Sequence, residues 1–165
     1  MANCAHKLLI FSPNLLTISF INHTRQEVES VKEPVGIEEY SGNGEKILVV
    51  DDVETQRDIA ANLLKKLNYT VETVASGEEA IEHMKNNTAD LLVLDMIMDP
   101  GIDGLDTYKH ITENIPGQKA IITSGFSETD RVREVQKLGV GAYIRKPYTL
   151  EKIGLAVKSE LERRS

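Results

Sequence analysis

The sequence has no tryptophan and one cysteine, Cys4, among its 165 residues. A single cysteine cannot form a disulfide or a thiolate metal cage within the chain. Aromatic residues make up only 5% of the chain, which leaves little for a platform on which nucleic-acid bases could stack. The lack of a cysteine network agrees with a reducing compartment, and we expect a cytoplasmic protein.

Positive charge is also scarce. The formal net charge is −7, and the lysines and arginines form no cluster along the sequence. Proteins that bind nucleic acid through its phosphates carry a basic surface, so we expect no nucleic-acid partner. The histidines show no metal-ligand spacing and are predicted to be structural or solvent-facing: His6, His23, His83 and His110.

Long unbroken apolar runs are missing as well. Residues 8–21 are apolar, but Pro13 and Asn14 interrupt them, and the stretch is too short to span a membrane. It also lacks the strongly basic start and the Ala-x-Ala-like end of a signal peptide. We therefore expect no membrane association.

The composition of the chain changes near residue 45. Residues 22–45 are acidic, contain Pro34 and end in Ser-Gly-Asn-Gly, which is typical of a linker. From Lys46 onward, strand-like and helix-like segments alternate without a gap. The sequence thus predicts an N-terminal extension over 1–45 and one folded domain over 46–165.

Five strand-like segments alternate with five helical ones in the second part. The predicted strands are residues 46–50, 70–75, 91–95, 120–124 and 142–144. Most are continuous apolar runs, as expected of parallel strands buried on both faces, whereas 70–75 alternates and is predicted to lie nearer an edge. This pattern predicts an α/β fold with a doubly wound parallel sheet. The flavodoxin-like (βα)5 strand order 2-1-3-4-5 is the best match for five units.

Helix limits and apolar faces are predicted from capping residues and spacing. Ser76 with Glu79, and Ser127 with Asp130, are predicted to begin helices, and Thr149 is predicted to cap the last one. Asn68 and Gly139 are predicted to end the first and fourth helices. The predicted apolar faces are Ile59, Leu63, Leu64 and Leu67 in the first helix (Glu54 to Leu67), Val132, Val135 and Leu138 in the fourth, and Ile153, Leu155, Val157 and Leu161 in the last.

Acidic residues end two of the apolar runs. Asp51 and Asp52 follow the first strand, and Asp95 ends the third. Parallel sheets bring the carboxyl ends of their strands to one edge, where these acids would repel one another unless a cation neutralises them. Oxygen ligands with room for water favour Mg²⁺ over zinc. Alternatively, Asp51 and Asp52 could only cap the following helix, but the matching position of Asp95 disfavours this.

A hydroxyl and an ammonium end two further strands. Ser124 ends the fourth strand and is followed by Gly125, and Lys146 follows the fifth. Taken singly, Ser124 could be a helix cap and Lys146 a solvated charge. Together with a metal-binding carboxylate they can neutralise the oxygens of an incoming phosphoryl group while the carboxylate attacks it. The sequence therefore predicts a magnesium-assisted phosphoryl-acceptor site.

Over residues 46–163 the chain resembles the receiver domain of two-component response regulators. The matching stretches are VVDD (49–52), LVLDMIM (92–98), Asp103–Gly104, IITSG (121–125) and GAYIRKP (141–147). The resemblance implies that Asp95 accepts a phosphoryl group from the phosphohistidine of a histidine kinase or phosphotransfer protein. It also implies that Asp52, Asp95 and the Ile97 carbonyl ligate Mg²⁺, and that Asp51 holds the ion largely through water.

The resemblance further assigns the switch. Ser124 and Lys146 would bind the acyl phosphate, and the Lys146–Pro147 bond would be cis. Tyr143 would move inward when Ser124 shifts toward the phosphate, which would remodel the face made by the fourth helix, the fifth strand and the fifth helix. That face is a candidate for homodimerisation.

Kinase docking in the family uses the first helix and the loop after the fifth strand. Ile59, Leu63 and Tyr148 are therefore the expected contacts with the kinase.

The chain departs from the family pattern in the loop after Asp95. This loop, MIMDPGIDG, is one residue longer than the commonest spacing, and the difference falls in the turn that carries the backbone ligand. Asp99 is an extra acid there, either a metal ligand or part of a surface turn.

The predicted function is that of a single-domain response regulator in a phosphorelay. It would promote its own phosphorylation and dephosphorylation without acting as an enzyme on other substrates, and it would signal by contact with an unidentified protein. The alternative is a Mg²⁺-dependent phosphohydrolase that uses Asp95 as a transient nucleophile. Such enzymes usually place a second acid where this chain has Ile97. An FMN carrier is disfavoured because Asp51 and Asp52 would repel its phosphate.

The N-terminal extension allows a hypothesis about origin. Residues 17–29 loosely resemble the last strand of a histidine-kinase ATPase domain, which in hybrid kinases precedes a receiver. The extension could thus be the remnant of a hybrid kinase, or a disordered tail.

Overall fold

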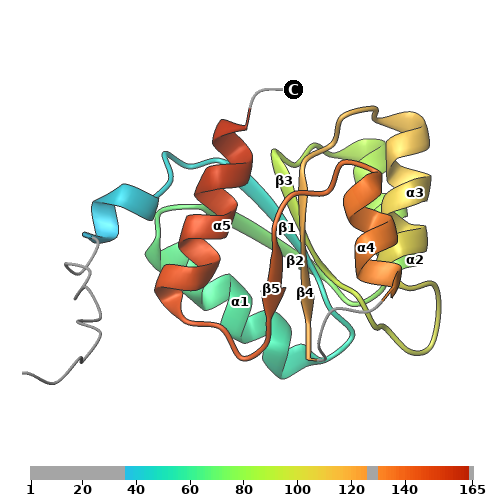
Figure 1. Ribbon diagram of the computed structural model, residues 1–165, viewed down its shortest axis with the longest axis horizontal. Helices are drawn as coiled ribbons and strands as arrows, with labels where there is room; N and C mark the ends of the chain where they lie inside the picture. Colours follow the sequence, from blue (N-terminus) through green and yellow to red (C-terminus); the bar gives the residue numbers. More distant parts are fainter. Residues whose placement is uncertain (1–35, 126–129, 164–165) are drawn as a thin grey trace, which may run out of the picture. The chain divides into compact units, whose positions relative to one another are not determined.

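A computed structural model of the chain describes residues 36–125 and 130–163. It contains a five-stranded parallel sheet in the order β2-β1-β3-β4-β5 (Figure 1). The strands are β1 (Lys46–Val50), β2 (Thr70–Val74), β3 (Leu91–Asp95), β4 (Ala120–Ser124) and β5 (Tyr143–Arg145). The predicted fold class and strand order are confirmed, and β5 begins one residue later than predicted.

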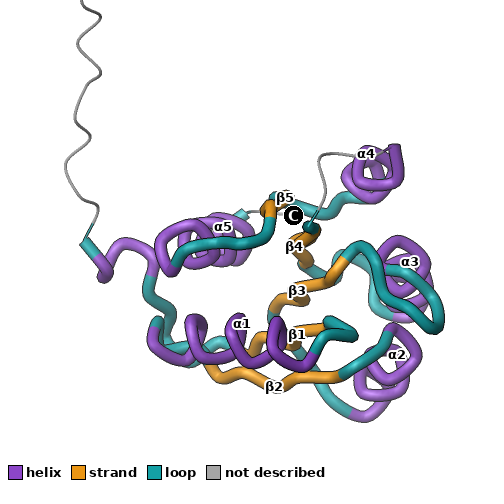
Figure 2. The backbone as a smooth tube through the Cα atoms, turned by 90° about the horizontal axis from the view of Figure 1, so that it is seen from below, coloured by secondary structure: helices purple, strands orange, loops and turns teal. Residues whose placement is uncertain are grey.

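Helices cover both faces of the sheet. They are α1 (Glu54–Lys66), α2 (Gly77–Asn86), α3 (Gly104–Asn114), α4 (Asp130–Lys137) and α5 (Leu150–Glu162), preceded by the short 3-10 helix η1 (Ile37–Tyr40). Seen along the sheet, α1 and α5 lie on one face, and α2, α3 and α4 on the other (Figure 2). None of the helices in the described part of the chain is long and apolar enough to cross a membrane.

The central strands are buried on both faces, which explains their continuous apolar sequences. Leu48, Val50 and Leu92 face the core layer under α2 and α3. Ile47 and Val49 face the layer under α1 and α5. Because side chains alternate along a strand, a strand between two helical layers must be apolar at every position. β2 is a half-exposed edge strand, in agreement with its alternating sequence.

Two of the predicted caps are confirmed by hydrogen bonds. Ser76 Oγ accepts from the Glu79 N–H at 3.2 Å, and Thr149 Oγ1 accepts from the Lys152 N–H at 3.2 Å. The Glu79 carboxylate accepts from the N–H of Ala75, one residue earlier than in the standard capping box. Ser127 lies outside the described residues, so the predicted cap of α4 cannot be compared.

The predicted apolar faces of α1 and α5 are partly wrong. Ile59 is 48% exposed and Leu155 is 41% exposed. In α1 the buried face is made of Ala60, Ala61 and Leu64. Small alanines bring the helix close to the sheet, and the buried stripe is therefore rotated by one position from the one marked by the larger residues.

The prediction for α4 also needs correction. Leu138 follows the last residue of α4 and is 45% exposed, so it does not contribute to a buried helix face. Gly139, with φ +100°, follows it and lets the chain turn away, as predicted. The side chains of Val132 and Val135 lie outside the described part of the structure.

Residues 37–44, within the predicted linker, pack against the ends of α1 and α5. Tyr40 is buried, and its carbonyl accepts from the Tyr69 hydroxyl at 3.3 Å. The Gly42 N–H donates to the Leu67 carbonyl at 2.8 Å. A Cβ built on Gly154 of α5 would lie 2.5 Å from the Tyr40 ring, so the ring occupies space that only glycine leaves free. The packed unit therefore includes residues upstream of β1.

Candidate functional site

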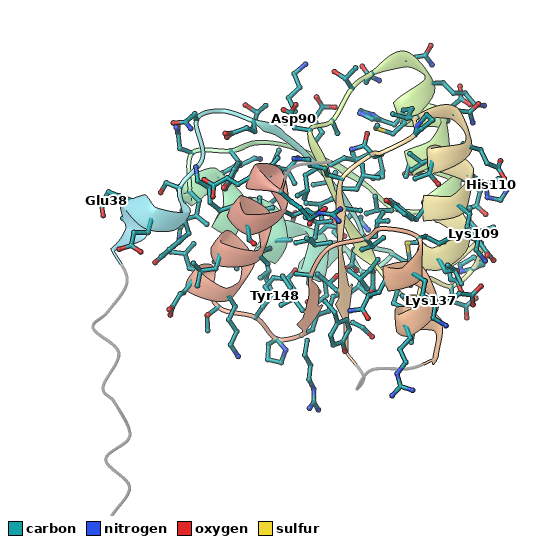
Figure 3. All side chains as sticks on the ribbon, turned by 45° about the horizontal axis from the view of Figure 1, so that its top comes forward. Glu38, Asp90, Lys109, His110, Lys137 and Tyr148 are labelled. Carbon is teal, nitrogen blue, oxygen red and sulfur yellow. The ribbon has the colours of Figure 1, made fainter. Side chains whose placement is uncertain are left out.

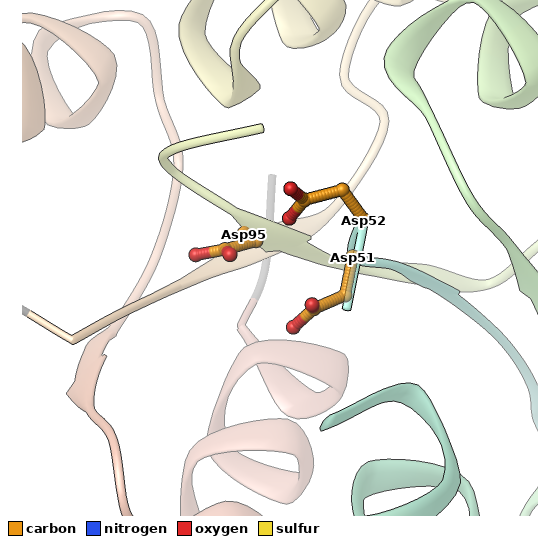
Figure 4. Close-up of side chains that lie close together, drawn as sticks. All are labelled: Asp51, Asp52 and Asp95. Atoms are coloured by element: carbon orange, nitrogen blue, oxygen red, sulfur yellow. The ribbon is translucent and has the colours of Figure 1, made fainter. Parts of the chain in front are cut away.

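Three carboxylates meet at the carboxyl ends of β1 and β3. Asp51 and Asp52 follow β1 and Asp95 is the last residue of β3, and one oxygen from each lies within 4.8 Å of the others (Figure 4). The strand register aligns these ends, because Val50 pairs with Leu94 in the sheet. Asp51 is 2% exposed and Asp95 7% exposed. Buried carboxylates this close require a cation or hydrogen-bond donors.

The alternative interpretation of the first two acids as helix caps is not supported. The N-cap of α1 is Val53, and no side chain caps it. Asp51 Oδ1 accepts from the Val53 N–H at 3.0 Å, which orients the carboxylate within the turn after β1. Asp51 thus lies beside the helix start, with one carboxylate oxygen within 4.8 Å of an oxygen of Asp52 and of Asp95.

Lys146 supplies a positive charge to the acidic group. Its Nζ lies 2.5 Å from Asp51 Oδ2 and 2.9 Å from Asp95 Oδ2. The side chain is 11% exposed, so Lys146 is not a solvated surface charge. The backbone N–H of Lys146 donates to the Ser124 carbonyl at 2.8 Å. The Lys146–Pro147 bond is cis, as the family resemblance implied.

The environment of Asp95 sets its protonation. Burial raises the pKa of Asp95 above its usual range, while the Lys146 ammonium opposes this through its charge and hydrogen bond. The charge of Asp51 raises the pKa of Asp95 further, and the Ile97 N–H lowers it. A bound cation would favour the ionised, nucleophilic carboxylate.

An open pocket of about 390 Å³ lies beside Asp95. It is lined by Asp52, Val53, Gln56, Asp95, Ile97, Gly125, Lys146 and Pro147. Among the residues that the structure describes, none has an atom within 4 Å of a Cβ built on Gly125, which lines the pocket. Ser124 is 2% exposed at the end of β4 and is not one of the lining residues.

The donor set of the site fits a hard divalent cation. The three acids offer only oxygen ligands, and the adjoining pocket leaves room for water, which is the environment that Mg²⁺ prefers. Asp99 is not a member of the acidic group. Its backbone N–H donates to Asp52 Oδ2 at 3.3 Å, so this residue contributes to the site through its main chain.

Arg57 is a site residue that the sequence did not reveal. Its Nη1 donates to the Asp51 carbonyl at 2.6 Å and to the Asp52 carbonyl at 3.1 Å. The guanidinium therefore fixes the turn that carries both acids. Because its partners are backbone atoms, no pattern of side chains could have indicated this role.

The predicted docking residues are only partly available to a partner. Tyr148 is 9% exposed and packs in the core layer with Ala60 and Ile153, so its prediction as a surface contact is wrong. Figure 3 shows Tyr148 at the opposite end of the sheet from Asp90. Burial raises the pKa of Tyr148, and the charges of Asp51 and Asp95 add to the effect. Ile59 is exposed, and Leu63 is half-buried.

Tyr143, the predicted switch residue, begins β5. Its side chain is partly buried and packs against the core layer under α2 and α3.

Comparison with known proteins gives consistent matches. The family model described as the response regulator receiver domain matches residues 47–158. The transcriptional regulatory protein ResD of Bacillus subtilis is 34% identical over 123 residues, which cover 74% of this chain and 50% of ResD. The chain thus spans about half the length of that relative. Sporulation initiation phosphotransferase F of the same organism is 34% identical over 124 residues, covering 73% of this chain and 97% of the relative.

Solved structures agree with these matches. A receiver domain protein described as CheY-like, from Methanospirillum hungatei, superposes with a TM-score of 0.68 at 25% identity. The match covers 72% of this chain and 94% of that one. The N-terminal domain of a three-domain response regulator from Carboxydothermus hydrogenoformans gives a TM-score of 0.66 at 29% identity, covering 71% and 94% of the two chains.

Proposed function

Because this chain belongs to the response regulator receiver domain family, we propose that it is a phosphorelay switch whose Asp95 accepts a phosphoryl group from a phosphohistidine. The donor would be a histidine kinase or a phosphotransfer protein. The observation that carries the proposal is the position of the Asp95 carboxylate, which joins two further acids, lies 2.9 Å from Lys146 Nζ and borders an open pocket.

The transfer follows from the chemistry of these groups. An Asp95 oxygen attacks the phosphorus, an O–P bond forms, and the P–N bond breaks with its electron pair returning to the imidazole. Lys146 compensates the charge of the phosphoryl oxygens, and the Ser124 hydroxyl donates to one of them. Asp51, Asp52, Asp95 and the Ile97 carbonyl would hold Mg²⁺, which when bound would supply further neutralisation of negative charge.

The readout would begin at the same residues. Before phosphorylation, the Lys146 ammonium binds Asp51 and Asp95, and the Lys146 backbone N–H donates to the Ser124 carbonyl. A phosphoryl group on Asp95 would therefore change the contacts of the residues at the carboxyl ends of β4 and β5. Tyr143 lies two residues before Arg145, which pairs with Ser124 in the sheet. The change would reach the face of α4, β5 and α5 and alter its affinity for a downstream protein or a second copy of the chain.

The phosphohydrolase alternative lacks a residue that could act as its general acid at the expected position. A general acid two residues after the nucleophile would be expected, and Ile97, which is 50% exposed, occupies that position. We therefore favour a phosphoacceptor whose own dephosphorylation resets the switch.

The decisive experiment is labelling with a small phosphodonor. We expect the protein with Mg²⁺ and acetyl phosphate to form a base-labile adduct on Asp95 that mass spectrometry can locate. Asp95→Asn should abolish it, and Asp99→Asn, which removes an acid outside the cluster, should retain it. An unlabelled wild type, or undiminished labelling of Asp95→Asn, would overturn the proposal.

A further inference from the structure

The loop between β3 and α3 is the part of the site in which this chain departs from the family spacing. It covers residues 96–103 and begins directly after Asp95. At its base the Met96 N–H donates to the Thr123 carbonyl at 2.9 Å, and the Gly104 N–H donates to the Met96 carbonyl at 3.2 Å. These bonds close the two ends of the loop, and its middle is held by other contacts.

Two carboxylates from other elements bind the middle of this loop. Asp52 Oδ2 accepts from the Asp99 N–H at 3.3 Å. Glu78 Oε1, from the first turn of α2, accepts from the Ile102 N–H at 3.1 Å. Asp52 belongs to the acidic group, so a bound cation would compete with the Asp99 N–H for the Asp52 carboxylate. Glu78 is outside that group, and its bond to Ile102 is compatible with an occupied site.

Gly101 packs directly on the Glu78 carboxylate. Its φ is +126°, a conformation that favours glycine. A Cβ built on Gly101 would lie 2.8 Å from Glu78 Oε2 and 2.9 Å from Oε1. The carboxylate thus lies against the turn of the longer loop and binds the N–H that follows it.

The start of α2 forms a firm base for this contact. A Cβ built on Gly77 would overlap Thr107 Oγ1 of α3 and lie 2.6 Å from Ile102 Cγ1. The helix start, the loop and α3 are therefore packed without spare space. Hydrogen bonds from its own N–H and from Ile102 lower the pKa of Glu78, so the carboxylate is ionised at neutral pH and accepts both bonds as an anion.

We propose that Glu78 is a positioning residue for the magnesium site: it holds the far end of the loop that carries Ile97, so that the loop keeps its place when Asp52 binds the metal. The inference deepens the proposed function, because it concerns the ion that assists phosphoryl transfer. It also assigns a role to the turn at Gly101 in the longer loop, which the Glu78 carboxylate contacts.

The test compares three variants in α2. Glu78→Ala removes both loop contacts, whereas Glu78→Gln keeps an amide oxygen that can accept from Ile102. Glu79→Ala is the matched control, because it also removes an acid from the first turn of α2 but its carboxylate bonds to Ala75. NMR would follow hydrogen exchange at the Ile102 amide in the metal-free proteins, and then amide shifts during titration with Mg²⁺.

The expected results separate positioning from general stability. Glu78→Ala should speed exchange at Ile102 and raise the Mg²⁺ concentration for half-saturation by about threefold, the effect expected of one exposed charged hydrogen bond. Glu78→Gln should recover part of both changes. Glu79→Ala should lower the melting temperature without moving the Mg²⁺ midpoint.

Three outcomes would overturn the inference. These are an unchanged midpoint in Glu78→Ala, an equal shift in Glu79→Ala, and a wild type that does not respond to Mg²⁺. If the wild type binds Mg²⁺ with the expected variant pattern but acetyl phosphate leaves Asp95 unlabelled, the positioning role stands and the proposed function fails.

Discussion

Lys146 Nζ lies 2.5 Å from Asp51 Oδ2, which is closer than its 2.9 Å distance to the proposed phosphoacceptor, Asp95. The ammonium therefore compensates a carboxylate that is also a proposed metal-binding group. In the metal-free protein the ammonium supplies part of the positive charge that a divalent cation would bring to these acids.

This relationship predicts that Lys146 weakens magnesium binding. In Lys146→Met, the acids lose a competing positive charge at a buried position, and we expect the affinity for Mg²⁺ to rise by about tenfold. Calorimetric titration would measure it. Lys152→Met, which removes an exposed lysine from α5, is the control for net charge. An affinity that is unchanged or lower in Lys146→Met would contradict the prediction.

Arg57 is predicted to stabilise the turn after β1. Its two hydrogen bonds to the Asp51 and Asp52 carbonyls come from a charged, half-buried donor. We expect Arg57→Ala to lower the free energy of unfolding in urea by about 1–2 kcal/mol. Arg57→Lys should recover only part of the loss, because an ammonium lacks the fork of the guanidinium. Stability equal to that of Lys66→Ala, an exposed position on the same helix, would refute this role.

We predict that the Tyr40 ring can pack in its place only because position 154 is a glycine. Replacing glycine by alanine inside a helix normally stabilises it by about 1 kcal/mol. At Gly154 the added methyl group would lie 2.5 Å from Tyr40 Cδ2 and 2.7 Å from Leu67 Cδ1, so we expect Gly154→Ala to destabilise the domain instead. The penalty should be smaller in a Tyr40→Ala background, as measured by a double-mutant cycle in urea. Equal penalties in both backgrounds would show that Tyr40 does not occupy this space.

The burial of Tyr69 predicts that the domain loses stability at alkaline pH. Burial raises the pKa of Tyr69 from 10.0 to about 12, and the charges of Glu45 and Glu162 add to the shift. Below pH 10 the phenol is neutral in both states, so its contribution is constant. Between pH 10 and 12 it ionises mainly in the unfolded chain, and the free energy of unfolding falls as the pH rises.

The variant Tyr69→Phe isolates this contribution. Over that range, the free energy of unfolding of the wild type should fall more steeply than that of Tyr69→Phe, by up to about 1.4 kcal/mol per pH unit. Urea unfolding at each pH would give both curves. Parallel curves would mean that the phenol is not protected by the fold.

The sheet and the acidic site could be predicted because both leave side-chain patterns. β1, β3 and β4 are largely buried on both faces and are therefore mostly apolar runs. β3 and β4 end in a polar residue, and β1 is followed directly by two acids, at the same edge of the sheet. Helix faces were less predictable. Ile59 and Leu155 fit the apolar spacing of their helices, but the buried stripe is set by how closely each helix approaches the sheet, and alanine and glycine allow the closest approach.

Contacts to the backbone could not be predicted from the sequence. Arg57 and Glu78 act on main-chain carbonyl and N–H groups, which every residue type offers equally. The burial of Tyr40 could not be predicted for a different reason. It stands in a stretch whose acidic, glycine-containing composition is typical of a linker, and its burial depends on Gly154, more than a hundred positions later in the chain.

The packing of Tyr40 has a practical consequence for how a fragment of this protein should be cut. The family match begins at residue 47, and a fragment trimmed there would retain the site acids and nearly all of the sheet. It would also remove the Tyr40 ring that packs against Gly154, and a tyrosine side chain of this kind buries on the order of 150–250 Å² of surface. Exposed apolar surface of that kind promotes self-association, so a soluble fragment should begin ahead of Ile37.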